Sequence, residues 1–186
     1  MKWIFFDIGS TLVDETEAYN HRAMNMLQGT GISFSQFDET RIAFAKQGLN
    51  GDSEAIRHYG LTKTPWPSEL EVPFPDAAET LRTLISKGYQ LGIIANQQPG
   101  TARRLEERGL LHFFTVIAAS AELGVAKPDP AIFLRALSMA NCPPQEACMV
   151  GDRLDNDILP AGKLGMKTVW IRKHLAKYQK IQVPII

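Results

Sequence analysis

Residues 1–14 read MKWIFFDIGSTLVD, and we expect the rest of the fold to form around them. Trp3 to Phe6 are apolar on both faces, as a strand buried inside a parallel sheet must be. The run stops at a carboxylate, Asp7, and small turn-forming residues follow at positions 8–11. Asp7 is therefore expected at the carboxyl end of the strand, where open α/β sheets place their ligands. From this segment alone, a helix cap or a solvated turn acid is the open alternative.

The composition is that of one medium-sized soluble domain, or of a core domain with a modest insertion. In 186 residues, Lys plus Arg and Asp plus Glu each number 20, so nothing indicates binding to nucleic acid or to a lipid surface. No apolar run has the length of a membrane span, and no signal peptide is recognisable at the amino terminus. We therefore expect no membrane partner and a cytoplasmic location.

The cysteines and histidines do not indicate a disulfide framework or a metal site of their own. Cys142 and Cys148 are too few for a framework and do not form a Cys-x-x-Cys pair. Cys148 lies in an apolar run and is expected to pack as a small hydrophobic residue. The four histidines are scattered without metal-ligand spacing and are expected to be surface or packing residues.

A small helical insertion is predicted after the first strand. Helical periodicity covers residues 15–27, 37–47 and 53–59, and proline clusters at 65–67 and 73–75 then interrupt regular structure. We predict two domains from this pattern. Residues 1–13 and 73–186 form the core, and residues 14–72 form a helical cap.

From Asp76 onward, strands alternate with helices. Strands are expected at 89–96, 116–119, 147–151 and 167–171, and helices at about 76–87, 101–108, 130–140 and 157–164. Asp76 and Glu79 have the spacing of a capping box at the start of the first of these helices. The alternation predicts an α/β protein with a Rossmann-like, doubly wound parallel sheet and helices on both faces.

Polar residues end four of the predicted strands and should meet at one edge of the sheet. These residues are Asp7, Asn96, Ser120 and Asp152. The carboxyl ends of parallel strands share one edge, so we expect the four side chains to lie near one another.

This edge is predicted to hold a divalent cation. Asp7 and Asp152 would repel each other unless a cation joined them, and Mg²⁺ suits an all-oxygen site that leaves room for phosphate. The loop GDRLDND, residues 151–157, adds Asp155 and Asp157. Lys127, in a loop stiffened by two prolines, is the expected compensating cation and could neutralise a phosphoryl group.

Taken together, these segments resemble the haloacid dehalogenase superfamily of aspartate-nucleophile hydrolases, most of which are Mg²⁺-dependent phosphatases. Residues 7–14 resemble its first motif, the strand end at Asn96 the second, Lys127-Pro128 the third and GDRLDND the fourth. The insertion stands where such proteins carry a helical cap.

The resemblance implies a role for each matching residue. Asp7 would be the nucleophile that forms an aspartyl-phosphate, and Asn96 and Lys127 would contact the phosphate. Mg²⁺ would be bound by Asp7, the backbone carbonyl of Gly9 and Asp152. Asp157 would stand behind them and orient Lys127 or a metal-bound water.

The chain departs from the family pattern at three positions. The usual phosphatases carry Asp two residues after the nucleophile as general acid and base, and this chain has Gly9. A carbonyl at this position is enough for the metal, but the loss of such an acid/base group typically costs about 10²- to 10⁴-fold in rate. Ala95 replaces a phosphate-contacting hydroxyl, and Ser10 replaces the customary glycine.

Three functional readings follow. The first is a slow or specialised phosphatase of small phosphorylated metabolites, which takes its acid from water, the cap or the substrate. The second is a dehalogenase or a phosphonatase-like hydrolase on the same nucleophile. Lys46 is the only central cap lysine that could form a phosphonatase Schiff base, and no surrounding pattern supports it. The third is a non-catalytic protein that binds a phosphate ligand. The oligomeric state, monomer or homodimer, is left open.

Overall fold

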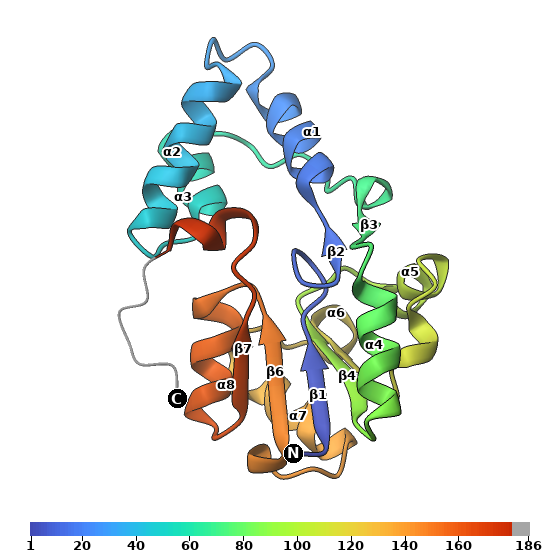
Figure 1. Cartoon of the computed structure of the whole chain (residues 1–186). Coiled ribbons are helices and arrows are strands. Elements are labelled where there is room, and N and C mark those ends of the chain that lie inside the picture. The colour runs from blue at the N-terminus through green and yellow to red at the C-terminus, as the bar shows by residue number, and fades with distance from the viewer. Residues whose placement is uncertain (180–186) are drawn as a thin grey trace. The chain divides into compact units, whose positions relative to one another are not determined.

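The computed structural model describes residues 1–179, which form two compact units. Among these residues, the sheet unit contains 1–13 and 72–171, and the helical unit contains 14–71 together with 172–179. Figure 1 shows the chain coloured along its length. No helix among the described residues is long and apolar enough to cross a membrane.

A five-stranded parallel sheet forms the centre of the sheet unit. Its strand order is β5-β4-β1-β6-β7, and every neighbouring pair is parallel. The strands are β1 (Trp3–Phe6), β4 (Gln90–Ala95), β5 (Val116–Ala119), β6 (Ala147–Gly151) and β7 (Lys167–Trp170). The prediction of a doubly wound parallel sheet is therefore confirmed.

Strand β1 is central because its side chains are apolar on both faces. All four of its residues are buried, and Phe6 lies in register with Ile93 of β4 on one side and with Val150 of β6 on the other. A strand with a polar face could not occupy this position without burying unpaired polar groups. The first strand therefore fixes where its carboxyl end, and thus Asp7, must lie.

Helices cover both faces of this sheet, and α4 and α7 lie on opposite faces (Figure 1). Leu81 of α4 and Leu105 of α5 pack in one apolar cluster, and Ile132 and Phe133 of α7 pack in the other. The helices of the unit are α4 (Ala77–Ser86), α5 (Thr101–Glu107), α6 (Ser120–Leu123), α7 (Pro130–Met139) and α8 (Leu159–Lys163), with a π-helical turn at Leu154–Ile158. A minor sheet pairs β2 (Val13–Asp14) with β3 (Val72–Pro73).

The predicted capping box at the start of α4 is wrong. Asp76 has helical dihedral angles, and its side chain makes no capping hydrogen bond. A capping box forms instead at the start of α2, where the Ser33 hydroxyl accepts from the backbone N–H of Gln36 and the Gln36 side chain accepts from the backbone N–H of Ser33. The extended backbone of Ser33 points its side chain at the unpaired N–H groups, which a residue already in helical conformation cannot do.

The helical unit is built on three helices, α1 (Thr16–Leu27), α2 (Phe34–Lys46) and α3 (Gly51–His58). Its apolar cluster includes Leu27 of α1, Phe37 of α2 and Ile56 of α3. The helical segments of the insertion were thus predicted within a few residues.

Residues 172–179 belong to the helical unit, whereas the predicted core included them. Their helical turn His174–Tyr178 contacts α2, and the His174 ring lies 4.6 Å from the Tyr19 ring of α1. Arg41 of α2 donates to His174 Nε2 at 3.4 Å. These contacts join segments far apart in the sequence, so no local pattern could have predicted them.

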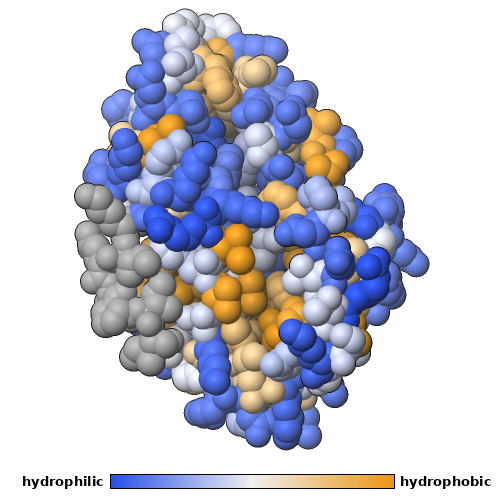
Figure 2. Space-filling view, viewed as in Figure 1, coloured by the Kyte–Doolittle hydropathy of each residue, from blue (hydrophilic) through white to orange (hydrophobic). Residues whose placement is uncertain are grey.

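The surface of the sheet unit is mostly hydrophilic in the view of Figure 2, with hydrophobic residues gathered over the strands. Val169 of the edge strand β7 is 47% exposed and lies in register with buried Val150. Both cysteines are buried and free, and Cys148 belongs to the apolar cluster on one face of the sheet, as expected for a small hydrophobic residue.

Candidate active site

Three aspartates meet at the carboxyl edge of the sheet. Asp7 follows β1, Asp152 follows the neighbouring strand β6, and Asp157 lies in the π-helical turn after β6. One carboxylate oxygen from each residue lies within 4.8 Å of the other two. The predicted convergence of strand ends thus brings Asp7 and Asp152 together, and the loop between β6 and α8 adds Asp157.

Lys127 is the cation of this cluster. It comes from the loop between α6 and α7, and its Nζ donates to Asp157 Oδ1 at 2.6 Å and to Asp7 Oδ1 at 2.8 Å. The Lys127 side chain is 2% exposed, and that of Asp157 is 1% exposed. A buried ammonium that spans two carboxylates holds both of them in fixed positions.

Burial and the neighbouring charges shift the pKa of Lys127 in opposite directions. Burial alone would lower the pKa of the ammonium, but the charges of Asp157 and Asp7 outweigh it, so the pKa of Lys127 is raised. Burial raises the pKa of Asp157 to about 6, although Lys127 acts against this rise. Lys127 therefore stays charged at neutral pH, ready to face an anionic ligand.

Asp152 is the third acid of the cluster, and its charged form is the one that the surroundings disfavour. Its pKa is raised well above the usual range, first by burial and then by the charges of Asp7 and Asp157. Within residues 1–179, its carboxylate has no hydrogen bond or ion pair. The cluster contains three acids and one lysine, and all the atoms that could bind a metal ion in it are carboxylate oxygens. This donor set fits Mg²⁺, which binds through one or two carboxylates and keeps positions for water and phosphate.

The turn after Asp7 carries no second acid. The backbone N–H groups of Leu12 and Val13 both donate to the carbonyl of Ile8, which closes a tight turn around Gly9 and Ser10. Ser10 has a φ of 52° and is 5% exposed. Glycine at position 9 offers only its backbone, so this turn cannot supply a general acid.

Asn96 and Ser120, which were predicted at the same edge, both bind backbone groups. The Asn96 amide donates to the carbonyl of Lys127 at 2.9 Å and accepts from the N–H of Lys127 at 2.7 Å. The Ser120 hydroxyl accepts from the N–H of Gln97 and donates to its carbonyl. Ala95 is fully buried and points no hydroxyl toward the site. The carboxyl end of β4 therefore contacts the Lys127 loop directly.

Three residues support the cluster that sequence reasoning did not single out. The indole N–H of Trp170 donates to the backbone carbonyl of Asp152 at 2.7 Å. The backbone N–H of Arg153 donates to Asp157 Oδ2 at 2.9 Å. A Cβ at Gly151 would lie 2.5 Å from the Asp157 carboxyl group, so only glycine leaves room for it. The glycine before Asp152 was the one visible signal, since a residue without a side chain often marks a close approach.

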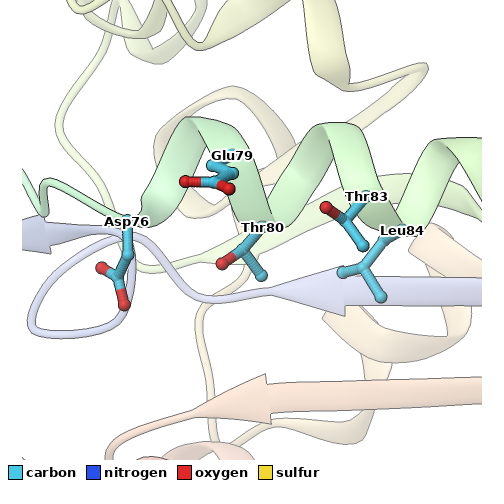
Figure 3. Close-up of a pocket in the computed structure, with 5 residues that line it drawn as sticks. All are labelled: Asp76, Glu79, Thr80, Thr83 and Leu84. Atoms are coloured by element: carbon cyan, nitrogen blue, oxygen red, sulfur yellow. The ribbon is translucent and has the colours of Figure 1, made fainter.

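A shallow pocket on α4 is separate from this cluster. It is lined by Asp76, Glu79, Thr80, Thr83 and Leu84. Figure 3 shows that these side chains come from one helix and the residue before it. Asp76 and Glu79 are exposed, and none of the lining residues belongs to the aspartate cluster.

Comparison with known proteins gives matches over most of the chain. Residues 1–165 match the family model described as haloacid dehalogenase-like hydrolase. A relative named glyceraldehyde 3-phosphate phosphatase from Methanothermobacter thermautotrophicus is 30% identical, covering 98% of this chain and 91% of the relative. One of the same name from Pyrococcus furiosus is 33% identical, with 98% and 85% covered. The crystal structure of a phosphatase of this family from Thermococcus onnurineus matches with a TM-score of 0.64 and 27% identity, covering 92% of this chain and 86% of that one.

Proposed function

Because this chain belongs to the haloacid dehalogenase-like hydrolase family, we propose that it hydrolyses phosphate monoesters of small metabolites at the cluster of Asp7, Asp152, Asp157 and Lys127. The observation that carries the proposal is the meeting of three carboxylates with one buried lysine at the carboxyl edge of the sheet. This arrangement provides a nucleophile, a cation for phosphate and an oxygen-rich place for a metal ion.

Asp7 is the proposed nucleophile. Lys127 binds its Oδ1, which holds the carboxylate in place and leaves Oδ2 for attack on phosphorus. The new bond joins Oδ2 to phosphorus while the ester P–O bond breaks, so the alcohol leaves as an alkoxide that must take up a proton. Water then hydrolyses the aspartyl-phosphate and releases inorganic phosphate.

Lys127 and Asn96 are the proposed phosphate-binding residues of the site. The Lys127 ammonium is desolvated, and its charge acts more strongly on phosphoryl oxygens there than it would in water. Asp157 keeps that ammonium in position, and one N–H of the Asn96 amide remains beyond its bond to Lys127.

Asp7, Asp152 and the carbonyl of Gly9 are the proposed ligands of Mg²⁺. The bound ion would supply Lewis-acid stabilisation of the phosphoryl group. Asp157 already pairs with Lys127 and accepts from Arg153, so we assign it a supporting position instead of a ligand's.

Gly9 makes slow or selective turnover the expected behaviour. With no acid in the turn after Asp7, the leaving alkoxide must be protonated by water or by the substrate itself. Substrates with good leaving groups should therefore react best.

Triose phosphates are the first substrates to test. Two relatives that match nearly the whole chain carry the name glyceraldehyde 3-phosphate phosphatase. We propose small phosphorylated sugars of this size as the substrate class.

The test is phosphate release from glyceraldehyde 3-phosphate, an aryl phosphate and a panel of other metabolites, with and without Mg²⁺. Asp7→Asn should abolish Mg²⁺-dependent turnover, and Gly9→Asp should raise it. Asp76→Asn is the matched control, because Asp76 is exposed and caps no helix. Equal turnover by Asp7→Asn and the unaltered protein would refute the proposal.

The absence of an acid at Gly9 also favours a second candidate, a protein that binds a phosphate ligand without hydrolysing it. It would bind inorganic phosphate in a calorimeter, lose that affinity in Lys127→Met and turn over no substrate even as Gly9→Asp. Halide release from a haloacid would indicate dehalogenase chemistry on Asp7 instead.

A further inference from the structure

We propose that Asn96, beyond its proposed phosphate contact, is a positioning residue that acts through Lys127. Its side-chain amide grips the Lys127 backbone and so fixes where the ammonium stands between Asp7 and Asp157. This inference rests on the proposed function, since it assigns to Asn96 a role in the chemistry of that site.

The contact is a two-point clamp between segments 31 residues apart in the chain. Asn96 Nδ2 donates to the Lys127 carbonyl at 2.9 Å, and the Lys127 N–H donates to Asn96 Oδ1 at 2.7 Å. A single hydrogen bond would leave the loop free to swivel about it. Two bonds in opposite directions fix both the position and the orientation of the Lys127 backbone.

Lys127 needs this restraint more than most residues. Its four-carbon side chain has many accessible rotamers, and the ammonium must meet two carboxylates at 2.6 and 2.8 Å. If the backbone shifted, the ammonium could keep at most one of these contacts without bending the chain out of its rotamer. The backbone clamp and the two ion pairs therefore hold opposite ends of the same residue.

The chemistry of the clamp selects asparagine. Aspartate could accept from the Lys127 N–H, but it would turn a second oxygen toward the Lys127 carbonyl and repel it. Alanine would make neither bond. Asn96 is itself exposed, and the buried part of β4 ends at Ala95, so substitution at 96 leaves the apolar core unchanged.

The experiment compares Asn96→Ala, Asn96→Asp and the control Gln98→Ala with the unaltered protein. Gln98 is an exposed amide residue of the same loop, and its backbone carbonyl accepts hydrogen bonds from Thr101 and Arg104. Steady-state kinetics on an aryl phosphate with Mg²⁺ give kcat and KM, and thermal unfolding gives the stability.

Asn96→Ala should lower kcat by about 10- to 100-fold, because a misplaced group costs mostly in the transition state. KM should rise by a smaller factor, through the loss of the proposed phosphate contact of Asn96. The kcat of Asn96→Asp should lie between that of Asn96→Ala and that of the unaltered protein. All three variants should unfold within a few degrees of the unaltered protein. The Lys127 amide proton should exchange faster with solvent in Asn96→Ala than in Gln98→Ala.

Two results separate the failure of this inference from failure of the proposed function. If Lys127→Met loses activity while Asn96→Ala matches Gln98→Ala, the phosphatase assignment stands and the positioning role is refuted. If Asn96→Ala and Lys127→Met both match the unaltered protein, Lys127 does no chemistry and both proposals fall. A loss in Asn96→Ala that is explained by unfolding, with Asn96→Asp fully active, would also overturn the positioning role.

Discussion

Each unit of the molecule buries one cation against two aspartates, and only one of the two clusters has the features of an active site. In the sheet unit, Lys127 pairs with Asp7 and Asp157. In the helical unit, Arg41 pairs with Asp38 and Asp52. Both cation side chains are 2% exposed, so burial of the cation does not distinguish the clusters.

The difference lies in the acids. The side chains of Asp38 and Asp52 are 39% and 23% exposed, so water still solvates their charge. Asp157 is almost completely buried, and burial together with the charges of Asp7 and Asp157 raises the pKa of the third acid, Asp152, because Lys127 does not compensate all three carboxylates. Unbalanced negative charge away from water is costly unless a cation binds there.

The cations are held differently as well. The Arg41 guanidinium faces the rings of Tyr19 and Phe37 at 5.6 and 5.9 Å, which adds cation–π attraction to its ion pairs. The surroundings of Arg41 therefore suit a structural role. In this molecule, the cluster with the features of a site is therefore the one whose paired acids, and not only its cation, are largely shielded from water.

The largest effect should follow from Lys127→Met. Loss of one preorganised cation should lower kcat by about 10²- to 10³-fold, as the removal of a single charge-stabilising group typically does. Phosphate-release kinetics at saturating substrate measure the effect. Unchanged kcat would mean that this cluster resembles the Arg41 cluster in being purely structural.

Arg41→Met should affect stability instead. Methionine roughly fills the volume, but Asp52 and His174 lose their partner, and the free energy of unfolding should fall by about 2 kcal/mol. Urea denaturation of the folded variant measures this loss. The activity of the folded fraction of Arg41→Met is then compared with that of Lys127→Met, the variant of the other cluster.

A pair of glycine substitutions tests the same contrast. The Cβ of Gly51→Ala would lie 2.3 Å from the Arg41 carbonyl oxygen, and that of Gly151→Ala would lie 2.5 Å from the Asp157 carboxyl group. Each clash should cost about 1–3 kcal/mol of stability. Only Gly151→Ala should also lower kcat once both variants are compared well below their unfolding temperatures. Equal kcat values would contradict the assignment of Asp157 to the active site.

The smallest effect concerns pH. Burial lowers the pKa of His174 below its unfolded value of 6.5, and the charges of Arg41 and Lys177 act in the same direction, whereas those of Asp52 and Asp14 oppose it. The unfolded chain therefore binds this proton more readily. Stability from neutral His174 is present above pH 6.5 and is lost as the pH falls through 6.5 toward the folded pKa.

Denaturation curves at about pH 8 and about pH 5.5 should show this loss as under about 1 kcal/mol. His174→Gln keeps an acceptor for Arg41 but cannot titrate, so it should lack this part of the pH dependence. A variant with the same pH dependence as the unaltered protein would show that His174 does not contribute.

The sequence predicted the fold because the relevant signals are local. The apolar run of β1 and the alternation that follows it require a parallel sheet, and the sheet then brings Asp7 and Asp152 to one edge. The family match confirmed both the resemblance and the hydrolase class that it implied. Cytoplasmic location, oligomeric state and the individual roles of the site residues remain predictions.

What could not be predicted depends on pairs of distant residues. The Asn96 amide has its partner 31 residues away, and the Arg41 contact to His174 spans 133 residues. A polar residue at a strand end is visible in the sequence, but the backbone group it binds is not. The capping-box spacing at Asp76 failed for a related reason, because the dihedral angles of that residue, and not its spacing, decide whether its side chain can cap.

The return of residues 172–179 to the helical unit has a practical consequence for anyone who divides this protein into pieces. That unit is discontinuous in the chain, so residues 14–71 expressed alone would lack Leu175, which lies beside Gly51, and the His174 partner of Arg41. A graft of these helices onto another scaffold, or a shortened gene, has to carry the later segment along with the earlier one. The natural unit of exchange is therefore two pieces of chain.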